Sequence, residues 1–243
     1  RVSRQTSALV VSVSQRRKVV GLYRAGRRVT VEDVTVVLAK ANQALQTLQR
    51  YRSRLDEVVA RLTLLEFEDA VTVGDVIAAV QRSELVQRVA REVARYVDQL
   101  GSEGRLVAMQ AEEVAANAVD EHTLLLRDYL VAPGPRQASA ARVALSEMNQ
   151  DGVLDDLAIA AVLGHSSSTE ALEHHARSRG YRILRRIPSL PSSVVNRLVD
   201  RFSALVVIAT ATEEQLDEVD GVGSRRARVI AEGLRRLRAS AVG

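Results

Sequence analysis

The chain has 243 residues, of which 47% are hydrophobic and 26% are charged, with a formal net charge of +4. This length allows two or three small domains, and the composition is typical of globular rather than disordered proteins. Cysteine and tryptophan are absent and only 3% of residues are aromatic, which excludes a disulfide framework and argues against binding nucleic acid by stacking on aromatic rings. No apolar run approaches the roughly 20 residues of a membrane span, and we expect no such segment.

The charges are distributed unevenly along the chain. Residues 1–60 carry 12 basic and 4 acidic side chains, and residues 181–243 carry 11 and 7, whereas residues 61–180 between them are net acidic. Only Lys18 and Lys40 are lysines, so nearly all basic residues are arginines, whose planar guanidinium can pair with a phosphate through two hydrogen bonds. The basic ends of the chain therefore favour a polyanionic partner.

The first elements in chain order are predicted to be strands. Ala8–Ser14 and Lys18–Tyr23 are short runs rich in β-branched residues, joined by a tight polar connection, and Arg27–Val31 can add a third strand. Because so few strands do not form a stable sheet alone in water, we expect them to belong to a larger sheet.

From Glu32 the apolar residues follow a helical period, which predicts an amphipathic helix of about 30 residues with Thr30 as its N-cap. The expected buried positions are Val34, Leu38, Ala41, Leu45, Leu48, Leu55, Val59 and Leu62. Thr72 and Asp75 have capping-box spacing and open a second helix, from Val73 to about Gln99, which Gly101 ends.

The next region is predicted to be a helical bundle. We expect one helix from Glu103 to Leu130, a break and linker at Pro133-Gly134-Pro135, and two or three shorter helices over residues 138–176. Breaks are expected near Asp151-Gly152 and in the segment from Gly164 to Ser168.

The motif that carries chemistry is Gly221-Val222-Gly223, which lies between two helical patterns. The first glycine can end a helix at positive φ, Val222 can pin the turn to both helices, and Gly223 allows a phosphate to approach the backbone. The next helix begins near Ser224, and its free N–H groups would face that phosphate. Arg225 and Arg226 stand on its first turn, Arg228 follows, and the small Ala227 permits close helix packing. This pattern indicates a helix-hairpin-helix; the alternative is a plain helical hairpin used in packing or dimerisation.

A second hairpin is expected upstream, at Pro188-Ser189-Leu190-Pro191, with the two prolines in place of the glycines. Because proline lacks an N–H, this copy should hold phosphate less well. Arg182, Arg185 and Arg186 precede it and are expected to contribute charge. Two hairpins can contact both strands of a duplex, and backbone contacts of this kind follow DNA shape rather than base sequence.

Three other patterns are predicted to be non-functional. His174 and His175 are adjacent and would point in different directions on a helix, so they would not share a metal. The acidic residues Glu66, Glu68 and Asp69 are expected to be a solvated surface, and the segment from Asp151 to Asp156 lacks the ligand spacing of a calcium loop. We therefore expect no metal site.

Several segments together resemble the DisA family of DNA integrity scanning proteins. These are Ala8–Tyr23, Leu38–Tyr51, Leu100–Gln110, Gly180–Val195 and Leu216–Leu237, which occur in the family's order. The resemblance implies three parts: residues 1–30 as the C-terminal remnant of an α/β diadenylate cyclase domain, 31–178 as a helical linker or spine, and 179–243 as a tandem helix-hairpin-helix domain. The expected fold class is thus mainly α.

The resemblance further implies a bacterial, cytoplasmic, nucleoid-associated octamer that makes cyclic di-AMP from two ATP with Mg²⁺ or Mn²⁺ and binds branched DNA such as Holliday junctions. It places Ser14, Arg16 and Arg17 beside the ATP triphosphate, where the alternative from the residues alone is a solvated basic turn. The family's Asp-Gly-Ala and Arg-His-Arg motifs are absent from the chain. We therefore expect a protein truncated at its N-terminus, inactive by itself and without catalytic residues.

Two alternatives to an inactive DNA-binding fragment remain open. The first is a complete cyclase whose N-terminal part is missing from the sequence. The second is a helical oligomerisation scaffold with neither DNA binding nor cyclase activity.

Overall fold

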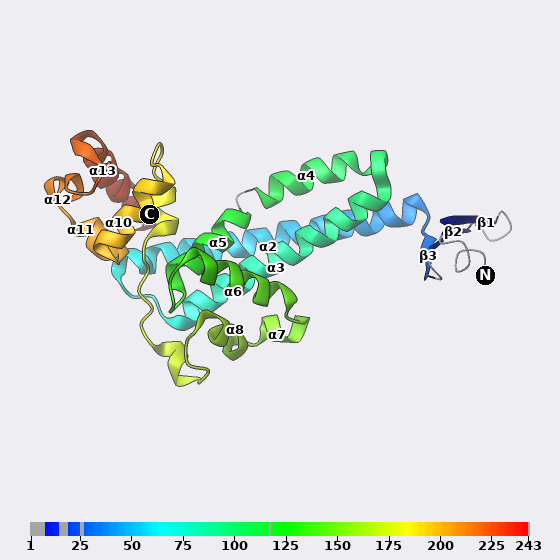
Figure 1. The fold of residues 1–243 in the computed structure, drawn as a ribbon, viewed down its shortest axis with the longest axis horizontal. Helices are drawn as coiled ribbons and strands as arrows, with labels where there is room; N and C mark the ends of the chain where they lie inside the picture. The colour runs from blue at the N-terminus through cyan, green and yellow to red at the C-terminus, as the bar shows by residue number, and fades with distance from the viewer. Residues whose placement is uncertain (1–7, 15–18, 25–26, 117, 243) are drawn as a thin grey trace. The chain divides into compact units, whose positions relative to one another are not determined.

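The structure of the protein is a computed structural model that describes residues 8–14, 19–24, 27–116 and 118–242. The fold is mainly α, as the sequence predicts. In chain order the elements are β1 (Val10–Ser14), β2 (Val19–Arg24), β3 (Arg27–Val31), α2 (Val34–Glu68), α3 (Val73–Leu100), η1 (Gly101–Gly104), α4 (Arg105–Ala115), α5 (Ala118–Tyr129), α6 (Pro135–Glu147), α7 (Gln150–Leu154), α8 (Asp156–Leu163), η2 (Glu170–Glu173), α9 (Tyr181–Arg185), α10 (Ser192–Phe202), α11 (Leu205–Thr210), α12 (Glu213–Asp217) and α13 (Gly223–Val242) (Figure 1).

The chain divides into two compact units. One comprises Arg1–Thr47 and Val89–Glu113, and the other comprises Leu48–Arg88 and Val114–Gly243. The long helices α2 and α3 each contribute to both units. The limits that the sequence predicts for three domains, at residues 30 and 178, stay predictions.

The three predicted strands form one antiparallel sheet in the order β1-β2-β3. Val10 lies opposite Tyr23 in the first pair, and Gly21 lies opposite Thr30 in the second. The side chains of Leu9, Val11 and Val13 are 56–67% exposed, so this face of β1 is open within the described residues. Ser14 ends β1, whereas Arg16 and Arg17 lie outside the residues that the structure describes.

The first long helix begins slightly later than its apolar pattern predicts. Asp33, and not Thr30, provides the cap: its Oδ1 accepts the Thr35 N–H at 2.8 Å, while Thr30 belongs to β3. The buried seam consequently starts at Val37, which is 3% exposed, and Val34 in the first turn is 49% exposed. From Ala41 onward most of the expected positions are buried.

The second long helix follows its sequence signals closely. Thr72 and Asp75 form the predicted capping box, because the Asp75 N–H donates to Thr72 Oγ1 at 3.2 Å and the Thr72 N–H donates to Asp75 Oδ2 at 3.1 Å. Gly101 follows the last residue of α3 with a φ of 57°, as expected of a glycine that ends a helix.

The single helix predicted from Glu103 to Leu130 is wrong. Two helices, α4 and α5, occupy this stretch. The sequence AANAVDEH around the break contains neither glycine nor proline, so no helix-breaking residue indicates that the helix ends here. Asp120 and Glu121 lie in the first turn of α5, where carboxylates interact favourably with the positive end of the helix dipole.

Helices α5, α6 and α8 pack with the end of α2 and the start of α3 around one apolar core. Its members include Leu62, Ile77, Leu125, Leu145 and Ile159, all at most 1% exposed. Pro133-Gly134-Pro135 is a turn inside this bundle rather than a domain linker, and Pro135 begins α6. The break predicted near Asp151-Gly152 lies slightly earlier, between the end of α6 at Glu147 and the start of α7 at Gln150. Asp151 and Gly152 themselves belong to α7, where the Gly152 N–H donates to the capping Asn149 Oδ1 at 2.7 Å.

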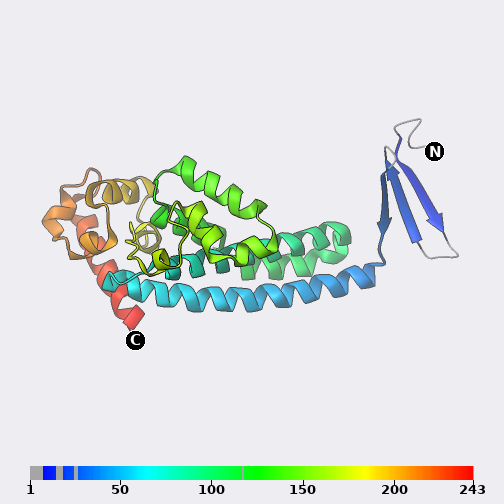
Figure 2. The same ribbon diagram turned by 90° about the horizontal axis from the view of Figure 1, so that it is seen from below.

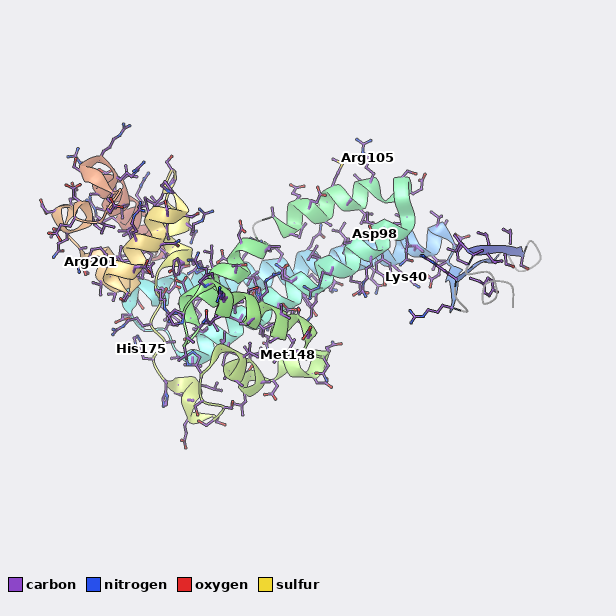
Figure 3. All side chains as sticks on the ribbon, in the orientation of Figure 1. Lys40, Asp98, Arg105, Met148, His175 and Arg201 are labelled. Carbon is purple, nitrogen blue, oxygen red and sulfur yellow. The ribbon has the colours of Figure 1, made fainter. Side chains whose placement is uncertain are left out.

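The segment after η2 returns to the connection between α2 and α3. Thr72 and His175 form an isolated antiparallel bridge, and the Ala176 N–H donates to the Val71 oxygen at 2.8 Å. His175, labelled in Figure 3, lies in this segment, with its Nε2 3.2 Å from Asp69 Oδ1. These contacts bring the chain to the start of α9.

Helices α9 to α13 form a C-terminal module with its own apolar core (Figures 1 and 2). Ile183, Leu198, Leu216 and Ile230 are fully buried in it. Phe67, from the last turn of α2, joins the same core and is 6% exposed. The long helix α2 thus contributes a side chain directly to the module that carries the predicted motif.

Candidate nucleic-acid interface

The Gly221–Gly223 turn has the backbone that the sequence predicts. Gly221 and Gly223 have φ values of 76° and 63°, in the left-handed region that glycine adopts without strain. Val222 between them is 3% exposed and packs in the core of the module, and its N–H donates to the Val219 oxygen at 2.9 Å. The turn is therefore fixed from inside while its glycines face outward.

The two glycines serve different purposes. A Cβ on Gly221 would lie 2.5 Å from an Nη atom of Arg197, whose Nε donates to the Asp220 oxygen at 2.5 Å. Gly221 thus makes room for an arginine that crosses from α10 to the hairpin, a contact that sequence reasoning missed. A Cβ on Gly223 would meet nothing within 4 Å, so the backbone at Gly223 is open to a ligand.

The first turn of α13 follows directly. The first N–H groups of a helix have no partner within it, and together with the helix dipole they form a site suited to anions. Ser224, Arg225 and Arg226 are exposed here, and Ala227 is fully buried. Arg226 donates through Nη1 to the Gly221 oxygen at 2.6 Å, whereas the Arg225 side chain has no hydrogen bond or ion pair with any other described residue.

Three acidic residues near this hairpin, Glu213, Glu218 and Asp220, are each matched by an arginine. Arg228 Nε lies 3.7 Å from a Glu213 oxygen, and Arg201, labelled in Figure 3, lies 3.8 Å from Glu218. Arg197 also approaches the Asp220 carboxylate at 3.6 Å. These exposed pairs contribute little stability, but they offset the negative charge that would otherwise repel a phosphate.

The upstream hairpin has the same layout with different chemistry. Ser189 has a φ of 61° and matches Gly221, the buried Leu190 matches Val222, and Pro191 matches Gly223 as the residue that opens a helix. Ser189, and not Pro188, therefore takes the position of the first glycine, which corrects the prediction that the two prolines replace the two glycines. Pro191 has no N–H to offer a phosphate.

The charges around the two hairpins are also arranged differently. The first turn of α10 holds Ser192 and Ser193, where α13 holds Ser224 and Arg225. The arginines lie instead on the preceding helix, where Arg185 Nη1 donates to Ser192 Oγ at 3.0 Å and Arg186 is exposed. The upstream hairpin thus depends on side chains from α9 for its positive charge.

Arg182, the first of the three arginines expected to contribute charge, is not at the surface. It is 1% exposed and forms an ion pair with Glu66 of α2, and it also donates to Thr63 Oγ1 at 2.9 Å and to Glu121 Oε1 at 3.3 Å. The expectation that Glu66 belongs to a solvated acidic surface is therefore wrong. Burying a charge is tolerated because its partner is buried beside it.

Asp128 extends this buried cluster to the backbone of α9. Its two carboxylate oxygens accept the N–H groups of Tyr181 at 2.7 Å and of Arg182 at 2.9 Å, so a residue of α5 caps a helix of the C-terminal module. Burial, reinforced by the negative charge of Glu66, raises the pKa of Asp128 to about 7. Tyr129 completes the cluster by donating to Glu66 Oε1 at 2.6 Å.

The described residues contain no group of three or more histidine, aspartate or glutamate side chains arranged to hold a metal ion. In the same part of the chain, no helix combines the length and the apolar character needed to cross a bilayer.

Comparison with known proteins gives consistent matches along the chain. The family model described as the DisA bacterial checkpoint controller linker region matches residues 31–172. The protein named DNA integrity scanning protein DisA from Symbiobacterium thermophilum is 47% identical over 238 residues, which is 98% of this chain and 67% of that protein. Proteins of the same name from Carboxydothermus hydrogenoformans and Parafrankia are each 46% identical, covering 98% and 100% of this chain and 68% of each relative.

The chain thus spans about two thirds of the length of these relatives. The family model covers more than half of the chain, including most of α2 to α8, and the relatives also extend over the hairpin module. The chain belongs to the DisA family.

Proposed function

We propose that the C-terminal module binds the sugar–phosphate backbone of DNA at the Gly221–Gly223 hairpin. The single observation that carries this proposal is the open backbone at Gly223, where an added Cβ would meet no other atom, at the start of a helix whose first turn holds Arg225 and Arg226. A phosphate placed there would accept hydrogen bonds from the helix N-terminus and ionic contacts from both arginines.

The relatives' name supports a role in DNA integrity scanning for the whole protein. Contacts to phosphates carry no base information, so a module of this kind responds to the shape of DNA. We therefore propose that the preferred ligands are branched structures, including Holliday junctions, and that the protein acts in the bacterial cytoplasm in association with the nucleoid.

We further propose that the family's cyclase chemistry, two ATP to one cyclic di-AMP and two pyrophosphates with Mg²⁺ or Mn²⁺, is coupled to this DNA binding in an octamer. Ser14, Arg16 and Arg17 would lie beside the triphosphate. These 243 residues contain neither Asp-Gly-Ala nor Arg-His-Arg, so we assign them no catalytic residue and expect no synthesis from this chain alone.

The hairpin is tested by replacing its cations. The chain with Arg225→Ala and Arg226→Ala should bind a four-way junction about tenfold or more weakly, because two phosphate contacts are lost. The slope of log affinity against log salt should also become shallower by about 2, since each phosphate contact to duplex DNA contributes about 0.9. Fluorescence anisotropy over a salt series measures both quantities.

Arg136→Ala with Arg142→Ala is the matched control, since it removes the same charge at two exposed arginines of α6, in the bundle rather than in the C-terminal module. Its affinity and salt slope should equal those of the unsubstituted chain. Equal affinities for all three proteins would overturn the DNA-binding proposal and favour the alternative of a helical oligomerisation scaffold, which sedimentation velocity would then test.

A further inference from the structure

A second basic site lies beside the upstream hairpin. It is a groove of about 290 Å³ between the end of α9 and the C-terminal half of α13. Its lining consists of Arg186, Ile187, Pro188, Gly233, Arg236, Leu237 and Ser240. No acidic residue is among them, so the groove has a positive charge from both arginines.

Both arginines are available to a ligand. The side chains of Arg186 and Arg236 are exposed, and neither guanidinium forms a hydrogen bond or an ion pair with the rest of the described chain. Three other arginines around the hairpins, Arg197, Arg201 and Arg228, pair with carboxylates instead. A larger cavity of about 540 Å³, which Arg186 also lines, contains Asp56, Asp120 and Glu121 as well as arginines, so its charge is mixed.

The remainder of the groove is apolar and closely packed. Ile187 is 3% exposed, and a Cβ on Gly233 would lie 3.1 Å from its side chain, so the glycine at 233 allows α13 to pack closely against Ile187. Pro188 has no N–H, the Ile187 N–H is already bonded to the Leu184 oxygen at 3.1 Å, and the Ser240 hydroxyl donates to the Leu237 oxygen at 3.0 Å. The two guanidinium groups are therefore the hydrogen-bond donors that this groove offers.

This combination of charged walls and an apolar floor fits the backbone of a DNA strand, with phosphate against the arginines and deoxyribose against Pro188 and Leu237. We propose that Arg186 and Arg236 form a phosphate clamp that holds the second strand of a duplex. This clamp replaces the backbone contacts to phosphate that the upstream hairpin, with Ser189 and Pro191 in place of two glycines, cannot provide. The inference rests on the proposed function, because it presumes that the Gly221–Gly223 hairpin holds the first strand.

The test compares a duplex with a single strand of the same length, using the whole 243-residue chain. Arg186→Ala with Arg236→Ala should weaken duplex binding about tenfold and make the salt slope shallower by about 2. Binding of the single strand, which the Gly221–Gly223 hairpin can hold alone, should change by less than about twofold. Circular dichroism establishes that the variant retains its helix content.

Arg235→Ala with Arg238→Ala is the matched control, because it removes the same charge from the same helix at exposed positions that do not line the groove. This variant should bind both DNAs within about twofold of the unsubstituted chain. If both double variants lose duplex affinity equally, or if the groove variant loses both DNAs equally, the clamp is wrong and the hairpin proposal stands. If the unsubstituted chain binds neither DNA, both proposals fail together.

Discussion

At the scale of single residues, the buried charges around Arg182 join the C-terminal module to the bundle. Arg182 pairs with Glu66 from α2 and contacts Glu121 from α5, and Asp128 holds the backbone of α9. Such a cluster need not stabilise the fold more than apolar packing would, but losing one partner leaves an uncompensated charge in the interior. The cluster therefore fixes which faces of these helices meet.

Replacing Arg182 by alanine should lower the free energy of unfolding by about 3–5 kcal/mol, since Glu66 would remain buried without a cation. Arg177→Ala removes an exposed arginine whose Nη2 lies 3.7 Å from Asp69, and should cost less than about 1 kcal/mol. Urea unfolding followed by circular dichroism measures both values. Similar losses of unfolding free energy for the two variants would show that a buried ion pair at Arg182 matters no more to stability than an exposed one.

The pKa of Asp128 predicts a specific dependence of stability on pH. A buried acid whose pKa rises from 3.8 to about 7 is protonated more readily in the folded chain than in the unfolded chain. Its favourable contribution is complete below about pH 4, and it is lost as the pH rises to about 7, by at most about 1.4 kcal/mol per pH unit. The stability of the unsubstituted chain relative to Asp128→Asn should therefore fall between about pH 4 and about pH 7.

Urea unfolding of both proteins at several pH values tests this dependence. Parallel stability curves over that range would mean that Asp128 does not titrate as its surroundings imply. Neither Asp128 nor Glu66 could be recognised from the sequence, because both are acidic residues in net acidic stretches and only the folded chain brings Arg182 beside them.

At the scale of elements, the sequence signals that act locally, such as capping residues and glycines, correctly predicted the helix ends and turns that they form. The capping box at Thr72 and the glycine at 101 gave the limits of α3 to within a residue, because both act through bonds within one turn of the helix. The same holds for Gly221 and Gly223, whose positive φ follows from the turn itself. The two-helix hairpin at the candidate site was therefore readable from the sequence.

Elements defined by distant contacts were not readable in this way. The apolar period runs through the break between α4 and α5 without a glycine or proline, and Asp151-Gly152 resembles a turn although Asn149 caps a helix through it. Arg197 crosses from α10 to the Gly221–Gly223 hairpin, and no local pattern in α10 marks it for that contact. The assignment of DNA-binding residues itself stays a prediction until the variants above are measured.

At the scale of the whole molecule, the described chain has two separate apolar cores in its larger unit. One lies in the bundle of α3, α5, α6 and α8, and the other lies in the C-terminal module and includes Phe67 of α2. Because each core gathers residues distant in sequence, periodicity could indicate which residues are buried but not which core each would join.

Phe67→Ala should destabilise the C-terminal module by about 3–5 kcal/mol, as is typical when a buried aromatic ring is deleted. Hydrogen exchange should then show lost protection in α10 and α13 and retained protection in α6 and α8. Leu145→Ala, a large-to-small change in the bundle core, should give the opposite pattern. Identical patterns for the two variants would mean that both cores unfold as one cooperative unit.

The two hairpins of the C-terminal module share a layout but differ in what precedes and follows them. Gly221–Gly223 follows an acidic helix and opens a helix with arginines in its first turn, whereas Ser189–Pro191 follows a basic helix and opens one with serines. A ligand with twofold symmetry would meet unequal half-sites, and turning it end for end would not restore the same contacts. Such a module has a polarity. Any duplex bound to both hairpins would therefore prefer one of its two end-for-end orientations on the protein.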